Sequence, residues 1–330
     1  MPTNVFITID TEHSIGGALR GQGLSPVGNE RVIFGRIGGK FYGIPLMMDI
    51  ADRFGLRLTF FLEVFNHHHF GQGASREVCE YILSRNHEVQ LHLHPAYLNF
   101  SLPDPSEKKY SDLIGNYDLA TQVEFFEEGC CLLEQYGAPR PKAFRAGCFG
   151  ANLDTLLALA KTGFAVDCSY NPAYVGKSCL LPEIEGNEVR SWNGIREYPV
   201  TGFKEVSYLR ASRKMALDIN GASFAEIRWL LLHAHAQGLR NVTIIAHSFS
   251  FLRSYDVQYR KVKPRKTAIK RFEKLCAFLA EHHGQFNVKT FGEIAADDQS
   301  AGPEGKSAPL PTMPSHLSVG RLWEQALDRL

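Results

Sequence analysis

The sequence lacks the cysteine pattern of a disulfide-bonded protein. Its seven cysteines are an odd number, and no two of them stand in a Cys-x-x-Cys spacing. Such a set is typical of reduced thiols and does not suit a disulfide framework. We therefore expect a cytoplasmic protein.

Long apolar runs and an excess of charge of one sign are also missing. No stretch approaches the roughly 20 apolar residues that a bilayer-spanning helix needs, so we expect no membrane span. The N-terminal stretch MPTNVFITIDTE becomes strand-like within a few residues, which leaves no room for the parts of a secretory signal. The 36 lysines and arginines and 35 acidic residues give a net charge of +1, so no broad basic surface and no nucleic-acid partner are expected.

The chain does have enough apolar residues for a sizeable core, at 44% of its 330 residues. Short β-branched and aromatic runs alternate with amphipathic helical patterns, which is typical of parallel sheets with crossover helices. The expected strands are 5–9, 58–64, 88–93, 143–145, 165–168, 196–199 and 242–246. The expected helices include 44–54, 75–85, 119–136, 153–161, 223–237 and 267–282. This alternation predicts an α/β barrel or a doubly wound sheet, and both folds place their chemistry at the carboxyl ends of the strands.

Composition divides the chain into three parts. The alternating pattern fills residues 1–296, which we expect to form the main body. Residues 297–316 (DDQSAGPEGKSAPLPTMPSH) are rich in proline, glycine, serine and charge, which predicts a flexible linker. Residues 317–330 carry apolar side chains at helical spacing. This C-terminal helix either docks on the body or contacts a partner, including a second copy of the chain in an oligomer.

Two histidines stand out at the end of the strand-like stretch EVQLHLHP. Side chains two apart on a strand point to the same face, so His92 and His94 are expected to lie together. The same spacing in His233 and His235 lies in a helical pattern, where residues two apart diverge by about 200° and do not chelate one ion. The alternative for His92 and His94 is a pair of hydrogen-bonded core histidines.

Other polar groups follow other expected strands. Asp10 and Glu12 end the first strand, Arg145 ends a short strand in FRAG, and His247 ends the strand VTIIA. Carboxylates, imidazoles and an arginine at neighbouring strand ends are the parts of a site for metal-assisted hydrolysis. The alternatives are a structural carboxylate for Asp10, an ion pair across the barrel mouth for Arg145 and a packed histidine for His247.

Taken in order, these motifs resemble the polysaccharide deacetylase family, carbohydrate esterase family 4. The stretches that carry the resemblance lie within 4–294 and are ITIDTE, LTFFLEV, NHEVQLHLHP, FRAGCFG, IIAHSFSF and FNVKTFGEI. The resemblance implies an irregular (β/α) barrel over residues 1–296. It also implies an enzyme that removes an N-acetyl group from a sugar of a polysaccharide or glycoconjugate precursor, with a divalent metal ion, expected to be zinc, as cofactor.

The sequence departs from the family pattern at two positions. Asp10 is followed by Thr11, where well-known members have a second aspartate, and Ala96 stands where a second histidine ligand is usual. The chain therefore looks like a divergent branch that reads DTE and HxHP. In such a branch His94 takes the place of the missing histidine, or the metal is held by fewer protein ligands.

The resemblance implies a role for each residue of the site. The implied metal ligands are Glu12, His92 and His94. The implied catalytic residues are Asp10 as the base, Arg145 as its partner and His247 as the acid that protonates the leaving amine. Among aromatic residues near the strand ends, Tyr97 and Trp192 are predicted to stack on a sugar face.

Several alternatives stay open. Residues 99–117 form either a lid over the substrate or a plain connector, and His67, His68 and His69 either reach the site or lie on an exposed loop. The enzyme alternative is a related barrel hydrolase that acts on another C–N bond or on a glycosidic bond. The alternative outside the enzymes is a non-catalytic homologue that binds a glycan or a partner.

Overall fold

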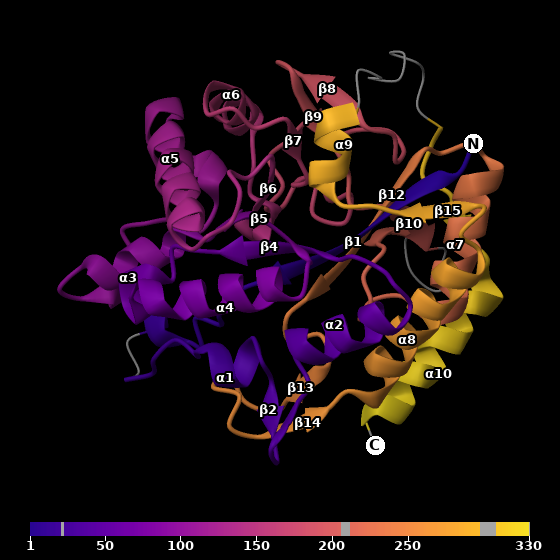
Figure 1. Ribbon diagram of the computed structural model, residues 1–330, viewed down its shortest axis with the longest axis horizontal. Coiled ribbons are helices and arrows are strands. Elements are labelled where there is room, and N and C mark those ends of the chain that lie inside the picture. The colour runs from indigo at the N-terminus through magenta and orange to yellow at the C-terminus, as the bar shows by residue number, and fades with distance from the viewer. Residues whose placement is uncertain (21–22, 206–211, 298–307, 330) are drawn as a thin grey trace.

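A parallel sheet with strand order β12-β1-β4-β5-β6-β7-β9-β8 forms the centre of the protein, with β15 paired to β1 as well (Figure 1). The computed structural model describes residues 1–20, 23–205, 212–297 and 308–329. Along the chain, the strands are β1 (Thr3–Thr11), β4 (Thr59–Glu63), β5 (Glu88–Leu93), β6 (Ala143–Ala146), β7 (Val166–Asp167), β8 (Arg190–Trp192), β9 (Ile195–Glu197), β12 (Asn241–His247) and β15 (Phe286–Val288). Only β8 runs antiparallel to its neighbour among the pairs of this sheet.

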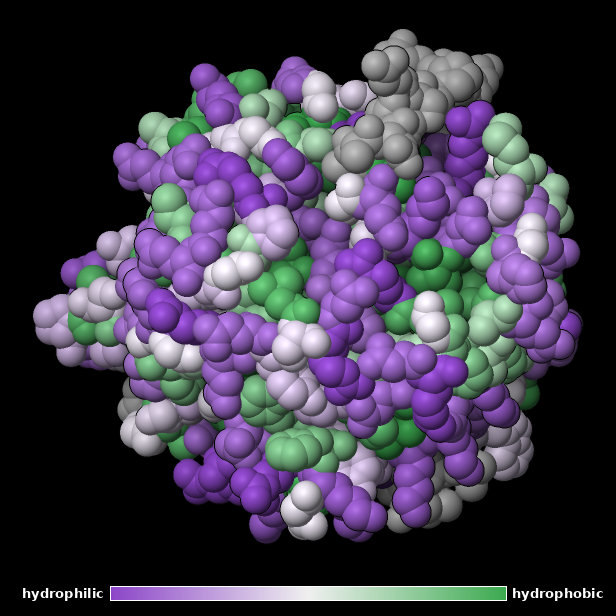
Figure 2. Space-filling view, viewed as in Figure 1, coloured by the Kyte–Doolittle hydropathy of each residue, from purple (hydrophilic) through white to green (hydrophobic). Residues whose placement is uncertain are grey.

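Helices surround this sheet and cover its outer face (Figure 1). The longer ones are α2 (Ile44–Arg53), α4 (Gln72–Ser84), α5 (Leu119–Gln135), α6 (Leu153–Lys161), α7 (Phe224–Ala236) and α8 (Lys266–Glu281). The short ones are α1 (Asn29–Val32), α3 (His67–Phe70) and α9 (Phe291–Asp297). On the face seen in Figure 2 hydrophilic side chains predominate and apolar ones form small patches, because the apolar sides of the helices turn toward the sheet.

The alternation of side chains along β1 separates an outer core from the inside of the curled sheet. Val5, Ile7 and Ile9 belong to the large core cluster beneath the helices. Phe6 faces the other way and stacks on Phe291 of α9, with ring centroids 4.6 Å apart. Further along β1, Asp10 lies on the same inner face as Phe6. The packed rings of Phe6 and Phe291 therefore lie below the polar end of the strand.

The curled sheet does not close by regular strand pairing. Beside β12, an irregular segment fills the opening: Ile245 donates its backbone N–H to Leu217, and Ile219 donates to Ile245. The same region contains a small sheet of β10 (Gly202–Glu205), β11 (Arg213–Ala216) and β16 (Thr312–Met313). The remaining short strands form two hairpins, β2 (Arg36–Ile37) with β3 (Lys40–Phe41) and β13 (Leu252–Ser254) with β14 (Val262–Pro264). The fold is therefore the irregular α/β barrel that the sequence predicts.

The C-terminal segment docks on the body. Helix α10 (Ser315–Arg329) begins inside the predicted linker, and β16 also lies there, while residues 298–307 fall outside the described part. The side chain of Arg321 is only 1% exposed and forms an ion pair with Glu205. Of the two alternatives for this helix, docking is the one observed, and oligomer formation stays a prediction. Among the described residues, no helix combines the length and the apolar character that crossing a membrane requires.

Candidate active site and metal centre

The polar strand ends meet at one cavity of about 690 Å³. Its wall includes Asp10, Glu12, His92, His94 and His247. Parallel pairing explains the convergence, because β1 holds Asp10 beside His247 of β12 and β5 is separated from β1 only by β4. Five of the six residues proposed for metal binding and catalysis thus line a single space.

Glu12, His92 and His94 form a set of three donors within this cavity. The Oε2 atom of Glu12 lies 3.2 Å from Nε2 of His92 and 2.5 Å from Nε2 of His94. Donor atoms of the three residues all lie within 4.8 Å of one another. Two imidazole nitrogens and one carboxylate oxygen are the donor types found at catalytic zinc sites that keep a position for water or substrate.

Hydrogen bonds to Nδ1 of His92 and of His94 orient the two rings, so that each Nε2 atom faces Glu12. Nδ1 of His92 lies 2.7 Å from the backbone oxygen of Arg145, and a carbonyl can only accept, so Nδ1 carries the proton. The lone pair of Nε2 then faces the Glu12 carboxylate, an arrangement of two acceptors that a cation between them would stabilise. Nδ1 of His94 lies 3.0 Å from both oxygens of Asp112, the carboxylate-histidine pairing typical of metal ligands.

The charges of the cluster also fit a cation. Burial opposes the charged form of His94, but Asp112 and Glu12 raise its pKa well above the ordinary value. Burial would raise the pKa of Glu12, yet the charge of His94 and the hydrogen bond from its ring hold this pKa well below its usual range. A proton on His94 therefore balances part of the negative charge, and a divalent ion can take its place. The residues present fit a zinc ion.

Asp10 and Arg145 form a buried ion pair at the cavity floor. The Nη1 atom of Arg145 donates to Oδ1 of Asp10 at 2.6 Å and to the hydroxyl of Thr8 at 2.9 Å. Asp10 is 3% exposed and Arg145 is fully buried, with its guanidinium 4.4 Å from the ring centre of Phe61. Breaking such a pair leaves an uncompensated buried charge, so Arg145 fixes the position of the Asp10 carboxylate.

His247 reaches the same cavity from β12. It is the last residue of that strand, pairs in register with Asp10 and donates its backbone N–H to the hydroxyl of Ser250 at 2.8 Å. Its ring lies beside that of Phe249, with centroids 5.2 Å apart. The strand end and the turn after it thus fix where the imidazole enters the cavity.

Sequence reasoning missed two carboxylates that contact His94, Glu63 at its backbone N–H and Asp112 at its ring. Glu63 ends β4, is fully buried, and accepts hydrogen bonds from the backbone N–H groups of Phe65 at 2.7 Å and Asn66 at 2.9 Å. Its position at the end of LTFFLE was a usable signal. Asp112 lies in the segment 99–117, where no periodic pattern singles it out. That segment packs onto the strand end through Asp112, so it is more than a plain connector.

The two predicted aromatic residues do not line the cavity. Tyr97 is 1% exposed and donates its hydroxyl to the backbone oxygen of His13 at 3.1 Å, while Trp192 of β8 packs against the core. A strand-end position alone does not say where a ring points, and the sugar-stacking role of these two residues stays a prediction. Phe149 and Tyr174 line the cavity instead, with ring centroids 5.1 Å apart.

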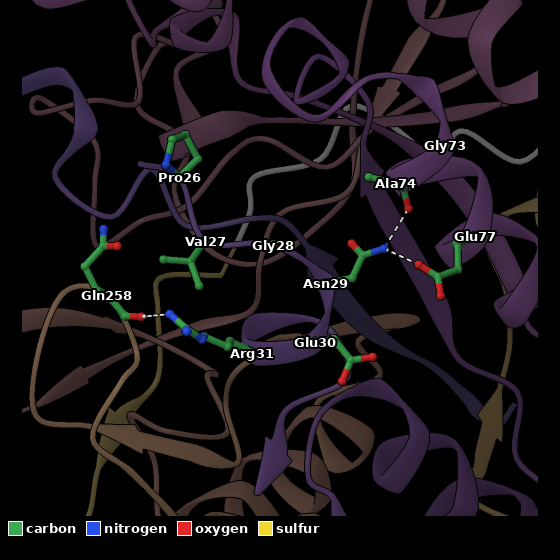
Figure 3. Close-up of a pocket in the computed structure, with 10 residues that line it drawn as sticks. All are labelled: Pro26, Val27, Gly28, Asn29, Glu30, Arg31, Gly73, Ala74, Glu77 and Gln258. Atoms are coloured by element: carbon green, nitrogen blue, oxygen red, sulfur yellow. Dashed lines mark hydrogen bonds between the residues drawn. The ribbon is translucent and has the colours of Figure 1, made fainter. Parts of the chain in front are cut away.

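A second, smaller depression of about 380 Å³ lies outside this site (Figure 3). In it, Asn29 donates to the backbone oxygen of Ala74 at 2.9 Å and to Glu77 at 2.7 Å. The amide oxygen of Asn29 contacts Nε2 of His13 at 2.5 Å. Burial lowers the pKa of His13 to about 4, so this histidine is neutral near pH 7. The hydrogen bonds of Asn29 therefore hold His13, the residue that follows Glu12, in place.

Comparisons with known proteins identify the fold. No protein-family model and no curated protein matches the chain. A crystal structure of a candidate polysaccharide deacetylase from Mycobacterium smegmatis matches with a TM-score of 0.50 and 16% identity, over 94% of each chain. The 4-alpha-glucanotransferase from Thermococcus litoralis matches with a TM-score of 0.50 and 8% identity, over 95% of this chain and 42% of the transferase. The chain thus shares its α/β barrel fold with a candidate polysaccharide deacetylase, as the sequence motifs predict.

Proposed function

We propose that the protein is a metal-dependent hydrolase that removes an N-acetyl group from an amino sugar. The observation that carries this proposal is one cavity that brings together a three-donor metal set, the Asp10–Arg145 pair and His247. The candidate polysaccharide deacetylase with the same fold supports it. Glu12, His92 and His94 would hold the ion, with His94 in place of the histidine that the family usually has at position 96.

Each residue has a defined task in this reaction. A divalent ion supplies polarisation of the amide carbonyl and acidification of water at such a site. Asp10 accepts the proton of the attacking water, and Arg145 holds its carboxylate in place. His247 donates a proton to the leaving nitrogen, because an amide anion is too poor a leaving group. A C–O bond forms, the C–N bond breaks, and acetate and a free amine leave.

The substrate class follows from the cavity and from the cysteines. Phe149 and Tyr174 offer ring faces at the cavity wall, which suits the C–H side of a pyranose. Every cysteine in the described part has a free thiol, which supports a reducing cytoplasm. We therefore propose a carbohydrate precursor of a surface polysaccharide or glycoconjugate as substrate, and residues 1–296 as the catalytic part.

The test is acetate release from N-acetylated sugars and sugar nucleotides by the zinc-loaded protein. We expect activity that chelation removes and zinc restores, and a loss of more than about 100-fold in kcat for Asp10→Asn, since general base catalysis contributes this much. Asp104→Asn, in an exposed loop, is the matched control and should keep full activity. Acetate release that persists in Asp10→Asn would contradict the assigned base.

A hydrolase for glycosidic bonds remains the second candidate within the enzymes. Such enzymes use two carboxyl groups that act on either side of the bond. Here Asp10 is held by Arg145 and Glu12 by two histidines, so the site favours amide hydrolysis over glycoside hydrolysis. A homologue that only binds glycans would show zinc and sugar binding without any acetate release.

A further inference from the structure

A second cluster of metal-ligating side chains lies on α3 and α5, and none of its members lines the active-site cavity. Nε2 of His67 lies 2.9 Å from Oε1 of Glu128, and Nε2 of His68 lies 3.8 Å from the same oxygen. One donor atom from each of the three residues lies within 4.8 Å of the others. Neighbouring helical residues normally diverge by about 100°, so the convergence of two adjacent imidazoles on one carboxylate is a specific arrangement.

The hydrogen bonds leave one nitrogen of this cluster without a partner. His68 uses Nδ1 for the hydroxyl of Ser101 at 2.9 Å, and the atom Nε2 is buried with no hydrogen-bond partner in the described part of the chain. Its distance to Glu128 exceeds that of a hydrogen bond. A buried polar nitrogen that lacks a partner is costly, and a metal ion at about 2.0–2.1 Å from it would remove that cost.

The two rings also favour an ion over a second proton. The centroids of His67 and His68 lie 4.1 Å apart at an interplanar angle of 33°, and Phe65 packs edge-on against both. Two imidazolium rings at this separation repel each other. A single cation shared by the two rings avoids this repulsion.

We propose that His67, His68 and Glu128 form a second zinc site that fastens α3 to α5. Both histidine side chains are 18% exposed and Glu128 is 40% exposed, so the ion can enter from solvent. Through Ser101 the site also contacts the 3-10 segment Pro95–Ser101, which directly follows His94. The second ion thus stabilises the segment after the first set of ligands without touching substrate. This inference does not rest on the proposed deacetylase activity.

The test is zinc titration by calorimetry on the metal-stripped full chain in a His92→Ala/His94→Ala background, which removes both histidines of the first site. We expect one bound equivalent, and a loss of affinity of more than about 10-fold when His68→Ala or Glu128→Gln is added. His69→Ala is the matched control, because His69 lies in the same run but packs against Phe70 and Phe100. It should bind zinc as the background does.

Two results would overturn the second site. One is a His92→Ala/His94→Ala protein that binds no zinc, and the other is equal zinc affinity when His68→Ala, Glu128→Gln or His69→Ala is added to it. Glu128→Gln keeps the size of the side chain, so its zinc affinity can still be interpreted if His68→Ala impairs folding. Cobalt absorption in the visible range, present in the His92→Ala/His94→Ala background and lost when either His68→Ala or Glu128→Gln is added, would further support the site. Loss of deacetylase activity alone would leave these measurements unaffected.

Discussion

At the scale of single residues, the electrostatics of the metal centre depend on one imidazole between two carboxylates. His94 contacts Glu12 through Nε2 and Asp112 through Nδ1. The outer carboxylate fixes the ring orientation and makes the inner nitrogen a better donor. In the proposed metal site Asp112 is therefore a positioning residue, although it lies in a loop and carries no sequence signal.

Asp112→Asn should weaken zinc binding by about 10–100-fold, because the amide is uncharged and has one accepting oxygen where the carboxylate has two. Competition with a chromophoric chelator measures the affinity. Asp104→Asn in the same loop is the control, since Asp104 caps the short turn at Ser106 and does not contact His94. Equal affinities in the two variants would show that Asp112 does not position the ligand.

Zinc binding should release a proton and strengthen as pH rises. The raised pKa of His94 means that this ring is protonated near pH 7 in the metal-free protein, and zinc must displace that proton. Calorimetry in two buffers of different ionisation enthalpy counts the protons. The count should fall in His94→Gln, and a wild-type titration whose heat is independent of the buffer would contradict the prediction.

The raised pKa of His94 also determines how the stability of the metal-free protein depends on pH. A pKa raised by folding stabilises the protein fully below the ordinary histidine value of 6.5, and this stabilisation is lost as pH rises through the raised pKa. The difference in Tm between wild type and His94→Gln should therefore shrink at alkaline pH. Thermal unfolding of both proteins across this range measures it, and a constant difference would assign the stability to packing alone.

At the scale of elements, the inner strands of the central sheet follow from the sequence because they are buried on both faces, while the more exposed β8 and β15 were not predicted. The expected strand 88–93 coincides with β5, and 242–246 lies within β12 (Asn241–His247). Register then explains why Asp10 and His247 meet. The short strands β10, β11 and β16 were not predicted, since two to four residues give no periodic pattern. Asp112 and Tyr174 lie in such aperiodic segments, so their places at the site could not be predicted.

The contact between β5 and the turn after β6 requires a glycine. A Cβ at Gly147 would lie 2.6 Å from Nδ1 of His94 and 2.7 Å from the backbone oxygen of Leu93. Gly147→Ala should therefore cost about 1–3 kcal/mol of stability, as overpacking does, and displace the His94 ring. Denaturant unfolding and zinc titration measure the two effects. Gly73→Ala, in α4 with open space around its Cβ, is the control and should be neutral or stabilising.

At the scale of the whole molecule, the C-terminal helix helps to hold together the irregular side of the barrel. Arg321 of α10 pairs with Glu205 of β10, lies 3.6 Å from Glu226 of α7 and donates to the backbone oxygen of Gly221 at 3.1 Å. Arg271 of α8 pairs with Glu324 at 2.8 Å. These contacts join the end of the chain to the segment that fills the opening beside β12, and Gly221 lies in the cavity wall.

Arg321→Ala should destabilise the fold by about 3–5 kcal/mol, because it removes the buried cation beside Glu226 and leaves Glu205 with the exposed Arg213 as its ion-pair partner. The midpoint of denaturant unfolding measures the loss. Trp323→Ala on the same helix is the control: its side chain is 69% exposed, so the stability of the monomer should not change. If α10 also mediates an oligomer, Trp323→Ala should lower the mass in sedimentation while Arg321→Ala lowers stability at every concentration. Equal unfolding midpoints for the two variants would mean that the ion pairs of Arg321 do not stabilise the barrel.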